Sequence, residues 1–132
     1  MAVVARHSIL VIDDEQGVRT FLKTALQGCG YSVDVVKDTT EAEIQLKDGG
    51  YIGIIVDFQL PAEDGMTFLQ RLRGQGIDIP AILISGYAIL DTMVNALDSH
   101  IAAFIVKPFE LRELIDIVNQ SFWPTNTLNY RS

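Results

Sequence analysis

The sequence is poor in several features that would each point to a particular class of protein. It has one cysteine, Cys29, which excludes an internal disulfide bond. It has no run of lysine or arginine, and its formal net charge of −7 argues against a surface that neutralises nucleic-acid phosphates. No uncharged stretch approaches the roughly 20 apolar residues of a membrane span. Residues 1–8 hold too short an apolar segment for a secretory signal. We therefore expect a cytoplasmic protein that contacts neither nucleic acid nor membrane.

Glycine-rich phosphate-binding motifs are missing as well. The sequence contains neither GxxxxGK[ST] nor GxGxxG, so nucleotide binding has no support. A hydrophobic content of 48% with 20% charged residues is typical of a folded chain rather than a disordered one. The length of 132 residues fits one domain, which we place at residues 1–122, followed by a polar tail or the start of a linker at residues 123–132.

Four apolar runs share one property, which is that each ends at a polar residue. They are residues 8–12 before Asp13 and Asp14, residues 52–56 before Asp57, residues 81–84 before Ser85, and residues 102–106 before Lys107. An unpaired carboxylate costs several kcal/mol or more to bury. We therefore expect these groups to emerge at the carboxyl ends of buried strands. In a parallel sheet those ends lie on one edge, where open α/β folds keep their ligand sites.

The segments between these runs predict the rest of the fold. Residues 31–36 alternate apolar and polar, which is typical of a half-solvated edge strand. Helices are predicted at residues 15–28, at 39–48 with Thr39 or Thr40 as the N-cap, and at 65–73, 89–99 and 110–122. This alternation specifies an α/β fold, a doubly wound, flavodoxin-like parallel sheet of five strands. The edge position of the second strand selects the order 2-1-3-4-5.

That strand order places three carboxylates in one pocket. Asp13, Asp14 and Asp57 should meet where the first and third strands end, flanked by Ser85 and Lys107. Crowded carboxylates repel one another unless a cation compensates them, and Mg²⁺ prefers such oxygen ligands. A metal, a lysine, a hydroxyl donor and a carboxylate nucleophile together favour phosphoryl transfer through an acyl phosphate.

Each of these residues also has a simpler interpretation. Asp13 and Asp14 can serve only as helix N-caps, Ser85 as a turn residue and Lys107 as a solvated charge. Their common position on one rim favours the functional interpretation. We take Cys29 as core filler and assign no role to His7.

Five stretches of the sequence resemble the receiver domain of two-component response regulators. They are ILVIDDE, GCGYSV, VDFQLPAEDG, ISGYA and FIVKPFE, in that order between residues 9 and 110. The resemblance implies that Asp57 is the phosphoacceptor and that Asp13, Asp14, Asp57 and the backbone carbonyl of Gln59 hold Mg²⁺. It further implies that Ser85 is the switch hydroxyl, that Lys107 contacts the phosphoryl group and that the bond from Lys107 to Pro108 is cis. The implied donor is a histidine kinase or a histidine phosphotransfer protein, for which small acyl phosphates can substitute.

The sequence departs from this family at several positions. Phe104 stands where the family often has tyrosine, so the switch must act through packing rather than a hydroxyl hydrogen bond. His100 and Ile101 replace a common Gly-Ala pair. Tyr87 is bulky enough to restrict access to the site, and we expect it to shield the phosphoryl group from water and prolong its lifetime.

Two further interpretations of the function remain open. An aspartyl-phosphate hydrolase of the haloacid dehalogenase type would carry a second Asp two residues after the nucleophile, where this chain has Gln59. A constitutive interaction module would use none of the site residues. For the favoured switch, we expect the fourth helix, fifth strand and fifth helix to contact the output partner, with homodimerisation as an option. The surplus of apolar residues at 89–99 fits such a surface, or equally a broad helix–sheet contact.

Overall fold

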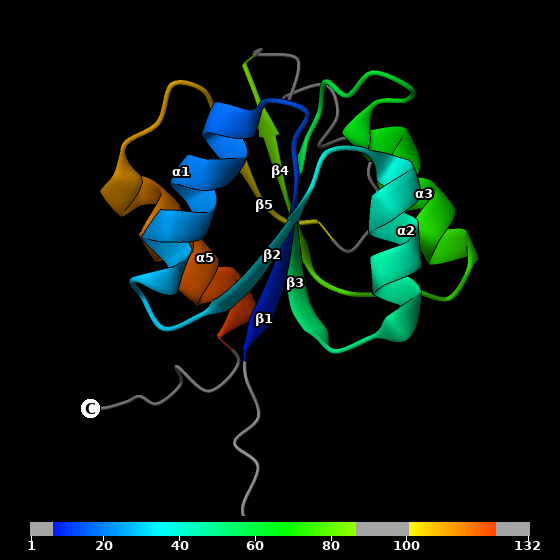
Figure 1. The fold of residues 1–132 in the computed structure, drawn as a ribbon, viewed down its shortest axis with the longest axis horizontal. Helices are drawn as coiled ribbons and strands as arrows, with labels where there is room; N and C mark the ends of the chain where they lie inside the picture. The colour runs from blue at the N-terminus through cyan, green and yellow to red at the C-terminus, as the bar shows by residue number, and fades with distance from the viewer. Residues whose placement is uncertain (1–6, 87–100, 124–132) are drawn as a thin grey trace, which may run out of the picture.

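Figure 1 shows a sheet enclosed between helices in the computed structural model of this chain. The structure describes residues 7–86 and 101–123. The predicted helix at residues 89–99, together with Tyr87, His100 and the predicted tail after Trp123, lies outside the described residues. No helix within the described ranges is both long enough and apolar enough to traverse a bilayer.

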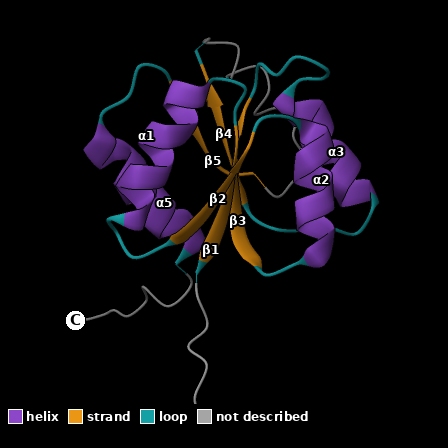
Figure 2. Ribbon diagram, in the orientation of Figure 1, coloured by secondary structure: helices purple, strands orange, loops and turns teal. Residues whose placement is uncertain are grey.

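All pairings in the sheet are parallel, and the strand order is β2-β1-β3-β4-β5, which confirms the predicted topology. The strands are β1 (Ser8–Ile12), β2 (Ser32–Val36), β3 (Tyr51–Asp57), β4 (Ala81–Ser85) and β5 (Ile101–Val106). The described helices are α1 (Gln16–Gln27), α2 (Thr39–Asp48), α3 (Gly65–Gly74) and α5 (Leu111–Phe122). Figure 2 shows α1 and α5 on one face of the sheet and α2 and α3 on the other.

The core consists of two hydrophobic layers, one on each face of the sheet. Successive residues of a strand point to opposite faces. Accordingly, Ile9 and Val11 pack in the layer under α1 and α5, while Leu10 and Ile12 pack in the layer under α2 and α3. Continuous apolar runs are therefore required in β1, β3 and β4, since both of their faces are covered. The pattern of β2 alternates because it lies at the edge of the sheet.

The N-cap of α2 differs from the predicted one. Asp38, not Thr39 or Thr40, caps this helix, and its Oδ1 accepts a hydrogen bond from the Glu41 N–H at 2.9 Å. Thr39 is buried as the first residue of the helix instead. Asp38 directly precedes the two threonines, and its carboxylate can accept the same capping hydrogen bond one residue earlier. The backbone of Asp38 is extended, as an N-cap residue requires.

The prediction that Cys29 fills the core is wrong. Its side chain is exposed, because α1 ends at Gln27 and the helical spacing that placed it inward no longer applies. Phe21 also belongs to the apolar stripe of α1 but is 47% exposed. It lies at the margin of the buried face, next to the candidate site described below.

Aromatic side chains join the end of α5 to the start of the sheet. The Trp123 ring stands edge-on to His7 and to Tyr31, with centroid distances of 4.1 and 5.6 Å. The Tyr31 hydroxyl lies 2.6 Å from Asn119 Oδ1, to which it donates. Burial raises the pKa of Tyr31 to about 12. His7, to which we assigned nothing, therefore contributes to the packing at this end of the molecule.

Candidate functional site

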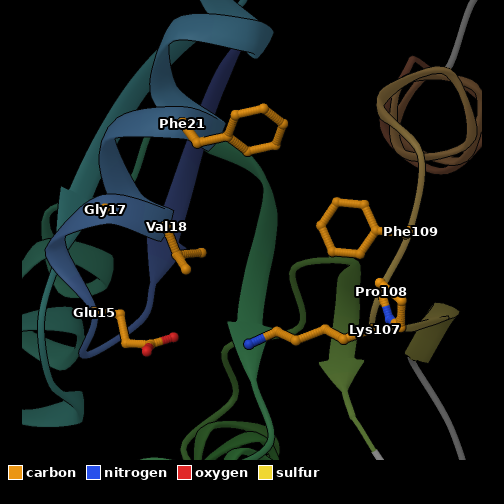
Figure 3. Close-up of a pocket in the computed structure, with 7 residues that line it drawn as sticks. All are labelled: Glu15, Gly17, Val18, Phe21, Lys107, Pro108 and Phe109. Carbon is orange, nitrogen blue, oxygen red and sulfur yellow. The ribbon is translucent and has the colours of Figure 1, made fainter.

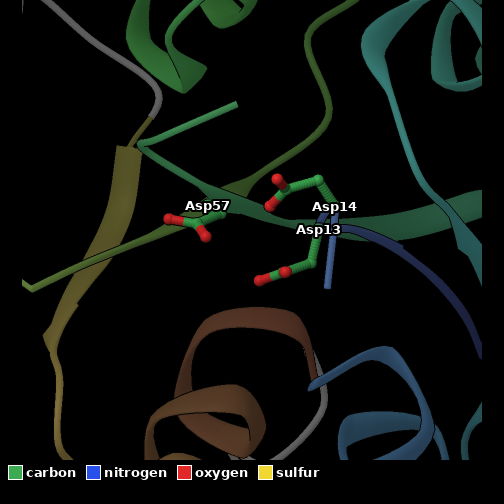
Figure 4. A group of neighbouring side chains, drawn as sticks. All are labelled: Asp13, Asp14 and Asp57. Atoms are coloured by element: carbon green, nitrogen blue, oxygen red, sulfur yellow. The ribbon is translucent and has the colours of Figure 1, made fainter. Parts of the chain in front are cut away.

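Three carboxylates meet where β1 and β3 end. The two strands are paired, with Ile12 opposite Val56, so the next residues, Asp13 and Asp57, are neighbours across the sheet. Asp13, Asp14 and Asp57 each offer an oxygen, and all three oxygens lie within 4.8 Å of one another (Figure 4). The sequence placed these residues together, and the structure does the same.

The burial of two of these carboxylates is greater than expected. Asp13 is 2% exposed and Asp57 6% exposed, although both were expected to emerge from the sheet. Burial raises the pKa of Asp13 to about 6, with a further rise from the adjacent Asp57 carboxylate. The Glu15 N–H donates to Asp13 Oδ1 at 2.9 Å and opposes this rise. An ionised Asp13 is therefore costly unless a cation is bound nearby.

Lys107 provides part of the required positive charge. Its Nζ lies 3.3 Å from Asp57 Oδ2, as the sequence indicated. The Lys107 N–H donates to the Ser85 carbonyl at 2.8 Å, which fixes the lysine at the end of β5 beside β4. The peptide bond from Lys107 to Pro108 is cis, as the family resemblance implied. Lys107 is thus held at the site and is not a freely solvated charge.

Ser85 and Phe104, the two expected switch residues, are in adjacent strands. Ser85 is the last residue of β4 and is fully buried, so the interpretation as a turn residue does not hold. It follows Ile84, which pairs with Asp57 across the sheet. Phe104 belongs to β5 and lies opposite Leu83 of β4. Its side chain is partly buried and packs against the hydrophobic layer under α2 and α3.

The chain after Asp57 folds back tightly onto the site. The Gln59 N–H donates to Asp57 Oδ1 at 3.1 Å, and the Gly65 N–H donates to the Phe58 carbonyl at 2.8 Å. A Cβ at Gly65 would lie only 2.5 Å from the Asp57 carbonyl oxygen. Sequence reasoning missed this role of Gly65. The available signal was a glycine at the start of a helix, a position where a side chain is ordinarily tolerated.

An apolar pocket of about 560 Å³ adjoins the carboxylate cluster. Figure 3 shows Phe21 and Val18 of α1 facing Phe109 and Lys107 of the segment that follows β5. Its lining consists of Glu15, Gly17, Val18, Phe21, Lys107, Pro108 and Phe109. Because Lys107 belongs both to the pocket and to the ion pair with Asp57, a molecule bound here lies next to the carboxylates. This pocket could not be predicted from the sequence, because helical spacing identifies an apolar face but not what covers that face.

The donor set fits a hard divalent cation. Among the residues that the structure describes, three carboxylates face one lysine, so the cluster carries excess negative charge, and no histidine or thiol of these residues contributes to it. Oxygen-only ligands with room for water are what Mg²⁺ requires. Gln59 lies beside the cluster, because its N–H donates to Asp57 Oδ1.

The fold and the site together define a flavodoxin-like α/β domain. Its acidic cluster, which suits a metal ion, lies between β1 and β3, where the strand order reverses. A family model, the response regulator receiver domain, matches residues 9–119. The chain therefore belongs to the receiver domain family, whose members act as phosphorylation-controlled switches in two-component signalling rather than as classical enzymes.

Relatives and solved structures agree with this assignment. The chain is 33% identical over 107 residues to the response regulator MprA of Mycobacterium tuberculosis, covering 81% of this chain and 46% of that protein. It is 34% identical over 111 residues to the swarming motility regulation protein RssB of Serratia marcescens, covering 84% and 51%. The chain thus spans about half the length of the curated relatives it matches.

Two solved structures extend the comparison to the fold. The receiver domain of Francisella response regulator 1452 superposes with a TM-score of 0.82 at 31% identity, covering 91% of this chain and 99% of that one. Response regulator TrrA of Thermotoga maritima, solved with Mg²⁺ and BeF, gives a TM-score of 0.77 at 29% identity, covering 86% and 97%.

Proposed function

We propose that Asp57 accepts a phosphoryl group from a histidine kinase or histidine phosphotransfer protein in a Mg²⁺-dependent reaction. The observation that carries the proposal is the position of the Asp57 carboxylate, which lies beside both the Lys107 ammonium and the carboxylates of Asp13 and Asp14. Such an arrangement suits a nucleophile that must approach an anionic phosphoryl group, because cations beside it offset the repulsion.

The residues of the site divide the work of the transfer. One oxygen of Asp57 bonds to phosphorus while the bond from phosphorus to the donor nitrogen breaks, and the donor imidazole keeps that electron pair. The Gln59 N–H already orients Oδ1 of Asp57. Lys107 exchanges its contact with Asp57 for the new phosphoryl oxygens, and the Ser85 hydroxyl donates one more hydrogen bond. Mg²⁺ held by Asp13, Asp14, Asp57 and the Gln59 carbonyl would supply charge neutralisation.

The apolar pocket beside Lys107 suits the docking of the phosphoryl donor. It adjoins the carboxylate cluster, and Phe21, one of its lining residues, is 47% exposed. An apolar side chain of the donor protein that fills this pocket would bring its histidine close to Asp57. Aromatic anchors in such pockets commonly dominate binding energy.

The output of the switch would pass through Ser85 and Phe104. Loading Asp57 draws Ser85 towards the phosphoryl group, and the space this leaves lets Phe104 move inward. Since phenylalanine has no hydroxyl, this coupling rests on packing alone. We expect β5 and α5, together with the segment of residues 89–99, to bind an output partner or a second copy of the chain with a changed affinity.

The lifetime of the phosphorylated state is a separate part of the proposal. Tyr87 follows the switch serine by two residues and would shield the phosphoryl group from water. Phosphorylated Tyr87→Ala should then lose its label faster than the wild-type protein. Faster loss from the wild-type protein would exclude this role of Tyr87.

The decisive test is incubation with Mg²⁺ and a small acyl phosphate, followed by intact-mass measurement. The wild-type protein should gain the mass of one phosphoryl group, and Asp57→Asn, which keeps the shape of the side chain, should gain none. Stable absence of the adduct in the wild-type protein would support the constitutive interaction module instead. Turnover of unrelated phosphomonoesters would support a hydrolase.

A further inference from the structure

Arg71 of α3 connects three parts of the molecule that lie on the α2 and α3 side of the sheet. Its guanidinium pairs with Glu43 of α2 and with Glu63 of the loop at residues 58–64. It also lies over the Phe68 ring, 5.4 Å from the ring centroid. The Phe68 ring fixes the place of the guanidinium, so Glu63, whose carboxylate pairs with it, is held at a defined position.

The 58–64 loop is the segment that carries Gln59. The loop is attached at its ends by the hydrogen bonds of Gln59 to Asp57 and of Gly65 to Phe58. Between these ends, Leu60 packs against the core and Glu63 pairs with Arg71. The Glu63 pair therefore fastens the part of the loop that lies between the acceptor and the start of α3.

We propose that Arg71 is a positioning residue of the acceptor site, which holds the 58–64 loop through Glu63 and thereby sets the affinity for Mg²⁺. The inference rests on the proposed Mg²⁺-dependent function, since the Gln59 carbonyl serves there as a ligand. Arg71 does not contact the metal in this scheme. It acts at a distance, by limiting the excursions of the backbone that presents the carbonyl.

The direction of the change in Mg²⁺ affinity distinguishes positioning of the loop from a simple effect of charge. Glu63→Gln removes a negative charge from the neighbourhood of the site, and Arg71→Gln removes a positive one. If only charge mattered, the first change would weaken Mg²⁺ binding and the second would strengthen it. If the pair positions the loop, both changes weaken binding. Glu43→Gln is the matched control, because it removes the other partner of Arg71 without touching the loop.

The experiment measures Mg²⁺ binding to the full chain by titration calorimetry at fixed ionic strength, with unfolding temperature as a second readout. We expect Glu63→Gln and Arg71→Gln each to weaken Mg²⁺ binding about threefold to fivefold, the scale of one partly exposed ion pair. Glu43→Gln should stay within about twofold of the wild-type protein while losing similar thermal stability. Tighter binding by Arg71→Gln, or wild-type affinity in both loop-pair variants, would overturn the inference alone. Failure of the wild-type protein to bind Mg²⁺ would overturn the proposed function itself.

Discussion

The substitution Gly65→Ala tests how closely the chain is packed behind the acceptor. Gly65 begins α3 and is not among the glycines with positive φ, so its backbone accepts an alanine without conformational strain. The added Cβ would lie 2.5 Å from the Asp57 carbonyl oxygen and 3.1 Å from Leu83 Cδ1. Ordinary van der Waals contacts begin near 3.4 Å, so the Asp57 backbone must move by several tenths of an ångström or more.

We expect Gly65→Ala to slow phosphorylation strongly and to lower the free energy of unfolding only modestly. Overpacking costs about 1–3 kcal/mol, and replacing a helical glycine by alanine returns up to about 1 kcal/mol. The net loss of unfolding free energy is therefore about 0–3 kcal/mol. A displacement of this size at a reacting carboxylate is more serious, because a shift of about 1 Å can slow a reaction about a hundredfold. We expect phosphorylation of Gly65→Ala to be at least about tenfold slower.

Gly53→Ala provides a control of equal steric severity away from the site. A Cβ at Gly53 would also meet its nearest atoms at 2.5 Å, but these belong to the Phe122 ring. Urea unfolding would compare the stabilities, and a time course of intact mass with acyl phosphate would compare the rates. Gly53→Ala should lose stability yet keep its rate of phosphorylation. A folded Gly65→Ala that is phosphorylated at the wild-type rate would refute the reasoning.

Three further predictions follow from the charges and hydrogen bonds of the structure. Asp13→Asn should raise the free energy of unfolding without Mg²⁺ by about 3 kcal/mol at pH 7, because it removes a buried charge whose pKa is raised from 3.8 to about 6. It should also abolish the rise in melting temperature on adding Mg²⁺, and a destabilised variant would contradict this. Lys107→Met should bind Mg²⁺ at least as tightly as the wild-type protein in calorimetry, because a competing cation 3.3 Å from Asp57 is gone. Its phosphorylation, followed by mass labelling, should slow at least about tenfold. Weaker Mg²⁺ binding or an unchanged rate would contradict this. Tyr31→Phe should lose about 1 kcal/mol below pH 10 through its missing bond to Asn119. Burial raises the pKa of Tyr31 to about 12, above an unfolded value of about 10. The stability difference between the wild-type protein and Tyr31→Phe in urea unfolding should therefore shrink as the pH rises from about 10 to about 12. A difference that stays constant would disprove the raised pKa.

The strands and the carboxylate cluster could be predicted because both depend on local patterns. The apolar runs before Asp13, Asp57 and Lys107 end within one residue of the strand ends, and the alternation in residues 31–36 marks an edge strand. Strand order then brings together residues that are far apart in the sequence. Burial of Asp13 could not be predicted in the same way, because it depends on how the following loops cover the strand ends.

Features that arise between elements were missed. Phe21 has the spacing of a core residue, but only the packing of α1 against the segment after β5 shows that it lines a pocket. The pair of Arg71 with Glu63 joins two residues that belong to no distinctive sequence pattern. The closeness of Gly65 to Asp57 follows from the path of a loop. None of these leaves a periodic signal in the sequence.

The acceptor site takes one functional group from the end of each of four strands: Asp13 after β1, Asp57 in β3, Ser85 in β4 and Lys107 after β5. No short fragment of the chain contains more than a part of this set, and none of the groups meet until the sheet has assembled. Phosphorylation of Asp57 would therefore also measure how many molecules are correctly folded. In a preparation of mixed quality, the fraction that takes up phosphate would count the properly folded chains.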